Sequence, residues 1–406
     1  MSATMTEICS EIEPLLKEKL FHPTFTSNSQ LDAAVSRFVK ACSAEPAEDP
    51  VQRVNAALPE LQVSNTAFWG DTERPLGALW ALNATVSMFL EGDREVWVFR
   101  NIVPDGVAAK AGIVAGDILA ATNGEPISKA PTFSPGKPYV LTLVDRDNRQ
   151  REVSLSDGRV VANNCPPIAP PPPAITSSVM RPGVGVLRIS GFPGIIGFDF
   201  ARQLTGVVRK LQREQCTRFV IDLRANHGGG LGSLRLMSLL TPKKVPIGYS
   251  LSRAARDAHK PQTALPVIDH IPSNKLGLWL MALRFKAMHK DRSLRLVTEG
   301  VSRPLQDRVA ILIDDSTRGG AENVAAFAQE NHLATLVGST TAGENLGAAN
   351  FTIAQRYHLR IPLVGWYLPT GHLAQAVTPD YSVTPTFSGL RQGREEVLDR
   401  AIELLQ

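Results

Sequence analysis

Two apolar segments in the second half of the chain, RFVIDLRA at 218–225 and RVAILID at 308–314, constrain the fold most strongly. Each contains a short uninterrupted apolar run, which is typical of a strand buried on both faces of a sheet. A glycine-bearing loop and a helix-like segment follow each run, at 233–240 and 321–331. Strands that alternate with helices predict an α/β fold with a parallel sheet, and sites in such folds lie at strand ends.

The rest of the chain changes character at three places. Apolar residues recur at helical spacing near the start, as in Ile8, Ile12 and Leu16, and predict a helical bundle over 1–75. Short β-like runs separated by turn signals predict a small β domain over 76–160. A proline-rich stretch predicts a stiff linker over 161–182. The α/β core then covers 183–406, with an insertion at 243–305 that carries a helix at 275–289.

Composition excludes several function classes. The net charge of +4 is spread along the 406 residues without a Lys/Arg run, which argues against a nucleic-acid partner. No window reaches about 18 uninterrupted apolar residues and the start lacks a signal-peptide pattern, so we expect a cytoplasmic protein without a membrane partner. Four cysteines without CxxC spacing predict no metal site and no disulfide framework, and nothing implies a cofactor: Cys9, Cys42, Cys165 and Cys216.

Three groups of residues follow the order found in one enzyme family. The first is IVPDGVAAKAGI at 102–113 with GDIL at 116–119, and the second is VIDLRANHGG at 220–229. The third is ILIDD at 311–315, continued by LVG at 336–338 and TAG at 341–343. Together they resemble the carboxy-terminal processing (tail-specific) serine peptidases, including the tricorn-core-like branch.

The resemblance implies a ClpP/crotonase-like α/β core domain with an embedded PDZ-like β domain and an N-terminal helical bundle. In that family the glycine loop offers backbone N–H groups to an oxyanion, a role that falls here on Gly228 and Gly229. Glycine suits this role because a residue without Cβ lets the backbone approach a substrate closely.

The sequence departs from the family at the nucleophile. The family's serine lies three residues before the glutamate that opens the helix, and that glutamate corresponds to Glu322. The serine position therefore holds Gly319, which cannot form an acyl-enzyme. The position of the general-base lysine holds Glu344. If the alignment slips by one or two residues, Ser316 or Ser339 becomes the nucleophile instead.

The tricorn-like catalytic set also lacks its expected members. That branch takes a histidine directly after a serine, whereas Asn65 follows Ser64 here. The late glutamate of that branch falls close to His372. The resemblance thus predicts a family scaffold whose usual catalytic side chains have been replaced.

A different set of ionisable groups is expected around the glycine loop. We predict His227, Glu344 and Arg318 as catalytic residues, because a carboxylate and an imidazole can move protons while backbone dipoles hold negative charge. The expected backbone donors are Gly228, Gly229, Gly319 and Gly320. The expected substrate-binding residues are Ser64, Asn65, Asn226, Ser316 and His372.

These residues leave three functions open. The first is a repurposed, non-proteolytic enzyme that cyclises, isomerises or eliminates on a small molecule, as in a biosynthetic pathway. The second is a pseudo-peptidase that binds a peptide or protein partner without turnover. The third is a serine hydrolase with a displaced nucleophile at Ser316 or Ser339. A small-molecule substrate is favoured over a peptide, and the oligomeric state is left open.

Overall fold

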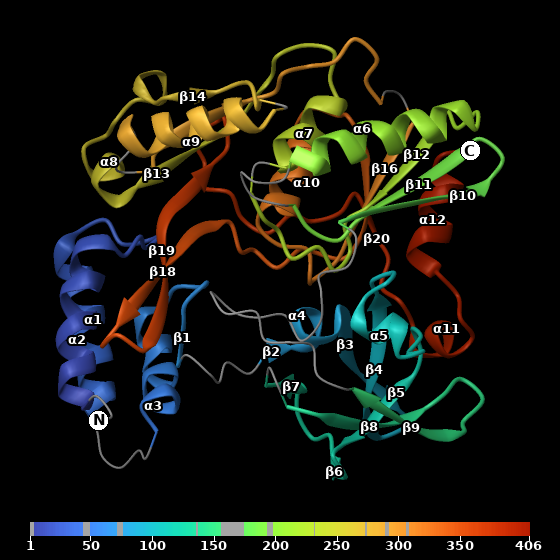
Figure 1. Ribbon diagram of the computed structural model, residues 1–406, viewed down its shortest axis with the longest axis horizontal. Helices are drawn as coiled ribbons and strands as arrows, with labels where there is room; N and C mark the ends of the chain where they lie inside the picture. Colours follow the sequence, from blue (N-terminus) through green and yellow to red (C-terminus); the bar gives the residue numbers. More distant parts are fainter. Residues whose placement is uncertain are drawn as a thin grey trace.

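A computed structural model shows an α/β core, a second sheet with the N-terminal helices, and a β-rich unit (Figure 1). The structure describes residues 4–43, 49–70, 76–134, 137–155, 174–192, 198–230, 232–272, 274–288, 292–305 and 308–406. Most of the predicted proline-rich linker, residues 161–173, lies outside these ranges.

The core sheet carries the two apolar segments at its centre. Its order is β10-β11-β12-β16-β17-β20, and each pairing from β11 onward is parallel. The strands are β10 (Ile175–Arg181), β11 (Val184–Ile189), β12 (Arg218–Asp222), β16 (Val309–Ile313), β17 (Thr335–Gly338) and β20 (Tyr381–Ser382). Because β10 occupies 175–181, the predicted linker ends earlier than expected.

Helices cover both faces of this sheet, as the apolar runs predicted. One face packs against α6 (Phe198–Arg213), α7 (Gly232–Leu239) and α10 (Gly320–Glu330). The other face packs against α12 (Glu396–Leu404). Neighbouring residues of β12 enter opposite layers, since Phe219 and Ile221 join the first cluster and Val220 joins the second. The predicted α/β fold is therefore confirmed.

A second sheet combines segments from the start, middle and end of the chain. Its path is β1-β19-β13-β15-β14, and β18 pairs with β19. The strands are β1 (Ala67–Gly70), β13 (Pro246–Ser252), β14 (Val267–Ile268), β15 (Leu294–Val297), β18 (Leu346–Ile353) and β19 (Tyr357–Tyr367). One expectation is corrected here, because residues 67–70 form a strand rather than part of a helical bundle. The predicted insertion at 243–305 carries a helix as expected, and it also contributes strands to this sheet.

The N-terminal helices pack against this second sheet. They are α1 (Met5–Lys19), α2 (Asn28–Ser43), α3 (Pro50–Ala57) and the 3-10 turn η1 (Leu58–Leu61). Their buried apolar face, which includes Ile8, Ile12 and Phe38, shares a core with Leu359 and Ile361 of β19. The middle segment adds α8 (Arg253–Asp257), the turn η2 (Gln262–Ala264) and α9 (Lys275–Met288).

Residues 76–155 form a β-rich unit with its own core. Its main sheet runs β3-β4-β5-β8-β9, with β6 on β5, and β2 pairs with β7. The elements are β2 (Leu76–Gly77), α4 (Ala78–Leu82), β3 (Ala84–Glu91), β4 (Arg94–Ile102), α5 (Val107–Lys110), β5 (Ile118–Thr122), β6 (Glu125–Pro126), β7 (Thr132–Phe133), β8 (Tyr139–Val144) and β9 (Gln150–Leu155). The turn helix α11 (Phe387–Arg391) packs against the unit through Leu390.

Within the described ranges, no helix has both the length and the hydrophobicity that a membrane crossing needs. Three cysteines are free thiols there, namely Cys9, Cys42 and Cys216. The same residues contain no group of three His, Cys, Asp or Glu side chains placed to hold a metal ion.

Candidate active site

The glycine loop after β12 is braced by the side chain of Asn226. Its Nδ2 donates to the Ile189 carbonyl at 2.8 Å, and its Oδ1 accepts the Gly228 N–H at 2.9 Å. Asn226 is fully buried and therefore shapes the loop, which corrects its predicted substrate-binding role. The Gly228 N–H is already occupied, so it does not serve as the expected oxyanion donor.

Glycine is required at two consecutive positions of the loop. Gly228 has a φ of +80°, and a Cβ there would lie 2.8 Å from the Arg318 carbonyl oxygen. Gly229 has a φ of +130°, and a Cβ there would overlap the Phe192 carbonyl oxygen. Phe192 hydrogen-bonds to the residues on either side of Gly229, at the Gly228 carbonyl and the Gly230 N–H. As in any such parallel bridge, the Gly229 N–H points away, and no described residue accepts it.

The N-terminus of α10 supplies a second open donor. Gly319, at the position where the family resemblance places serine, donates its N–H to Glu322 Oε2 at 2.8 Å. That N–H is therefore satisfied, contrary to the prediction. The next N–H, at Gly320, begins the helix and has no acceptor among the described residues. Gly229 and Gly320 remain as the available backbone donors.

Glu322 is a fully buried carboxylate that holds the loop after β17. Besides the Gly319 N–H it accepts the Gly343 N–H at 2.6 Å and the Glu344 N–H at 2.9 Å. It also accepts the Thr341 hydroxyl at 2.6 Å. Burial raises the pKa of Glu322, although these four donors oppose the rise. The side chain fixes the backbone on which Glu344 is mounted.

Arg318 and Glu344 form an ion pair across the two loops. The guanidinium donates to Glu344 Oε1, and the side chains are 32% and 31% exposed. Because both side chains are partly exposed, a molecule bound beside them can contact the pair. It also places a cation and an anion directly beside the Gly319 backbone.

The imidazole of His227 keeps solvent access yet is surrounded closely. It fills the space where Gly191 has no side chain, since a Cβ there would overlap the ring. Its ring stacks obliquely on Trp80, with centroids 4.7 Å apart and planes inclined by 40°. This desolvation lowers the pKa of His227, so the neutral imidazole prevails at neutral pH.

One cavity of about 330 Å³ gathers most of these groups. Its lining includes the predicted residues Asn65, His227, Gly228, Gly229, Arg318, Gly319, Gly320 and Glu344. The predicted Ser64, Asn226, Ser316 and His372 do not line it. Ser64 and His372 are exposed elsewhere, and Ser316 donates its hydroxyl to Asp315 at 3.3 Å.

The cavity also has walls that sequence reasoning missed. β13, β18 and β19 contribute Ser250, Leu346, Gly347, Ala348, Arg360, Val364 and Trp366. α10 contributes Asn323, and the loop between β17 and β18 contributes Asn345. No local pattern marked the strand residues, because their approach to the glycine loop depends on how the two sheets pack. Asn345 was within reach of sequence reasoning, since it directly follows Glu344.

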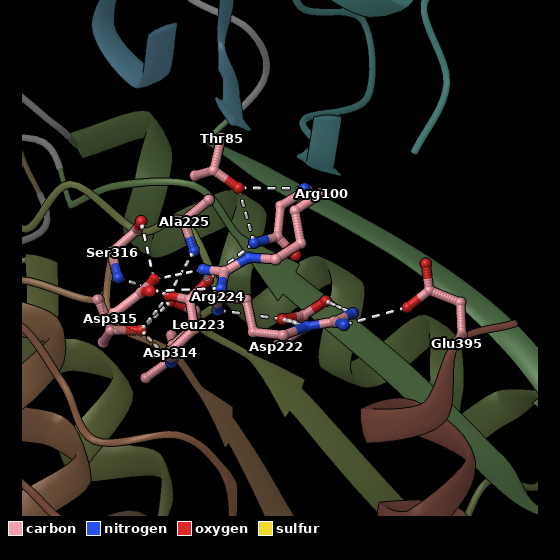
Figure 2. A network of polar contacts seen from close by, with 12 residues as sticks. Thr85, Arg100, Asp222, Leu223, Arg224, Ala225, Asp314, Asp315, Ser316 and Glu395 are labelled. Atoms are coloured by element: carbon pink, nitrogen blue, oxygen red, sulfur yellow. Dashed lines mark hydrogen bonds and ion pairs between the residues drawn. The ribbon is translucent and has the colours of Figure 1, made fainter. Parts of the chain in front are cut away.

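A buried polar network joins the β-rich unit to the strand end beside the site (Figure 2). Arg100 of β4 pairs with both Asp314 and Asp315, and the Asn101 amide donates to Asp314 Oδ2 at 2.7 Å. The other oxygen of Asp314 accepts the Ala225 N–H at 3.1 Å. One carboxylate therefore contacts both the β-rich unit and the glycine loop. Nearby, Arg224 pairs with Asp222 and with Glu395.

A glycine loop and a helix N-terminus thus lie together at the carboxyl edge of a parallel sheet that is joined to a β-rich unit. Residues 183–383 match the model of Peptidase family S41, so the chain carries a domain of that family. The predicted family resemblance is thus confirmed. No curated protein matches the sequence.

Solved structures agree over nearly the whole chain. The photosystem II D1 C-terminal processing protease aligns with a TM-score of 0.52 and 13% identity, covering 98% of this chain and 99% of the other. Mature CPAF complexed with lactacystin aligns with a TM-score of 0.58 and 15% identity, covering 98% of this chain and 97% of the other. A putative S41 protease from Bacteroides fragilis aligns with a TM-score of 0.57 and 17% identity, covering 97% of this chain and 96% of the other. At these identities the likeness shows the fold alone.

Proposed function

We propose that this peptidase-fold protein is a non-proteolytic enzyme that uses acid–base chemistry on a small molecule, by cyclisation, isomerisation or elimination. The observation that carries the proposal is the single cavity lined by His227, Glu344, Gly229 and Gly320. It combines a neutral base, a carboxylate and two open backbone donors. Gly319 stands at the position of the family's nucleophile and offers no side chain for an acyl-enzyme.

His227 is the proposed general base. Its neutral imidazole accepts a proton from a substrate carbon or heteroatom at neutral pH. The N–H groups of Gly229 and Gly320 then stabilise the negative charge that develops on a substrate oxygen. Glu344, held in place by Arg318, is the proposed second acid–base group of the same cavity. The proton returns to another atom of the substrate, which completes an isomerisation or a cyclisation.

The geometry gives less support to a displaced serine nucleophile. Neither Ser316 nor Ser339 lines the cavity, and Ser250, which does, donates its hydroxyl to the Arg292 carbonyl at 2.9 Å. A pseudo-peptidase remains the second candidate. The cavity volume of about 330 Å³ favours a small molecule over an extended peptide. In either case we propose that the β-rich unit is a PDZ-like domain, because the segments at 102–113 and 116–119 resemble a PDZ core.

Solvent exchange provides a test that does not require the substrate in advance. Small-molecule extracts are incubated with the purified protein in D₂O, and mass spectrometry looks for a metabolite that gains deuterium or changes mass. His227→Asn and Glu344→Gln should each lower the rate by roughly 10²–10⁴-fold, the usual contribution of a proton-transfer group. His372→Asn, an exposed histidine away from the cavity, is the matched control and should leave the rate unchanged.

A serine-directed probe completes the experiment. The wild-type protein should not react with a fluorophosphonate. Stoichiometric labelling that Ser316→Ala or Ser339→Ala abolishes would replace the proposal with a hydrolase. Full activity in both His227→Asn and Glu344→Gln would remove the assigned roles.

A further inference from the structure

An aromatic side chain from the β-rich unit contacts the candidate base. Trp80 lies on α4, yet its ring stacks on His227 of the glycine loop at 4.7 Å between centroids. Trp80 remains 46% exposed although it is a large apolar side chain. An indole that is half-open to solvent gains less from burial than a core residue.

The contact occurs where the β-rich unit is held to the core. Arg100 and Asn101, on the same unit, bind Asp314, which also accepts the Ala225 N–H of the glycine loop. Ala225 precedes His227 by two residues. The buried pairing fixes the unit and the loop relative to each other, and Trp80 reaches the imidazole across this junction (Figure 2 shows the polar part).

The imidazole has few other supports. The Gly191 backbone lies against one part of the ring. Arg318, Glu344 and Arg360 are the charged residues described in the same cavity, and the first two are paired with each other. Among the described residues, the hydrogen bond of the His227 side chain is to its own backbone, and no other residue holds a ring nitrogen. The orientation of the ring therefore depends on packing.

We propose that Trp80 is a positioning residue for His227, so that the site is complete only when the β-rich unit is docked on the core. The indole excludes water from one part of the imidazole and restricts its rotation. The catalytic consequence rests on the proposed function, whereas the effect on the imidazole does not.

The test measures the imidazole directly by NMR pH titration of the full chain with ¹⁵N-labelled histidine. The His227 signals are assigned by their loss in His227→Asn. In Trp80→Ala, water contacts a larger part of the ring, so the pKa of His227 should rise toward about 6.5, its value without burial. Its ring-proton shifts should also move as the indole ring current is lost. Trp80→Phe should keep most of the wild-type behaviour.

Trp279→Ala removes another exposed tryptophan, 59% accessible and outside the cavity, and serves as the matched control. An unchanged pKa and unchanged ring shifts in Trp80→Ala would overturn the inference, as would the same change in the control. Once a substrate is known, the acid limb of the pH–rate profile should move upward with the pKa. If the imidazole responds but activity never depends on His227, the positioning stands and the proposed function fails.

Discussion

Removal of the Glu322 carboxylate should destabilise the protein more than almost any other single change beside the site. The side chain is fully buried and accepts hydrogen bonds from three backbone N–H groups and one hydroxyl. A bond to a charged group contributes about 1.5–3 kcal/mol, and a buried donor without a partner costs about 1–3 kcal/mol. In Glu322→Ala all four donors lose their acceptor.

Two effects make the net destabilisation of Glu322→Ala smaller than the sum of these costs. Water entering the vacated space satisfies some of the donors, and the native state no longer buries a carboxylate. The expected net loss is therefore about 4 kcal/mol in the free energy of unfolding, a large share of the roughly 5–15 kcal/mol typical of a domain. Glu322→Gln keeps the shape and one carbonyl oxygen, and should lose about 2 kcal/mol because its amide group faces a donor.

Urea denaturation followed by circular dichroism measures both variants. Glu330→Ala, at the exposed far end of the same helix, is the control and should change the free energy of unfolding by less than about 0.5 kcal/mol. A loss below about 1 kcal/mol in Glu322→Ala would refute the reasoning. It would mean that the loop bearing Glu344 is held by other contacts.

Two further outcomes follow from the backbone and from a buried histidine. Ala225 has a φ of +57°, so Ala225→Gly should raise the free energy of unfolding by about 1 kcal/mol in urea titrations; a loss would contradict this. His22 donates from Nε2 to the Gln62 carbonyl and accepts two N–H groups at Nδ1, and burial lowers its pKa. The unfolded chain then binds more protons, so stability should fall as pH drops below about 6.5, by at most ~1.4 kcal/mol per pH unit. His22→Gln should flatten this slope, and an equal slope in both proteins would exclude the assignment.

The core of the fold was accessible from sequence because its signals are local. The runs at 218–225 and 308–314 became neighbouring parallel strands, and the residues after each run reached the same sheet edge. That edge placed His227 and Arg318 in one cavity. The sequence did not predict which backbone N–H groups are available to a substrate. That depends on whether side chains such as Asn226 and Glu322 already accept them.

Other misassignments came from long-range pairing. Residues 67–70 follow helices in the sequence, yet they pair with β19 about 290 positions later, as Ala67 does with Arg360. A short strand at a sheet edge has too few residues for a clear alternation, so its partner decides its conformation. Residues 175–181, which the sequence predicts as part of a linker, are an edge strand that pairs with β11.

By itself the sequence determined the α/β class, the family scaffold and the glycines at 228 and 229, whose positive φ angles no other residue adopts cheaply. Only the tertiary structure decided what surrounds His227. Gly191, Trp80 and the strands of the second sheet converge there from distant parts of the chain. The physical reason is the distance along the chain over which each effect acts, because backbone preference and apolar periodicity act over only a few residues. Desolvation of an imidazole and the volume of a cavity, in contrast, depend on every segment that packs nearby.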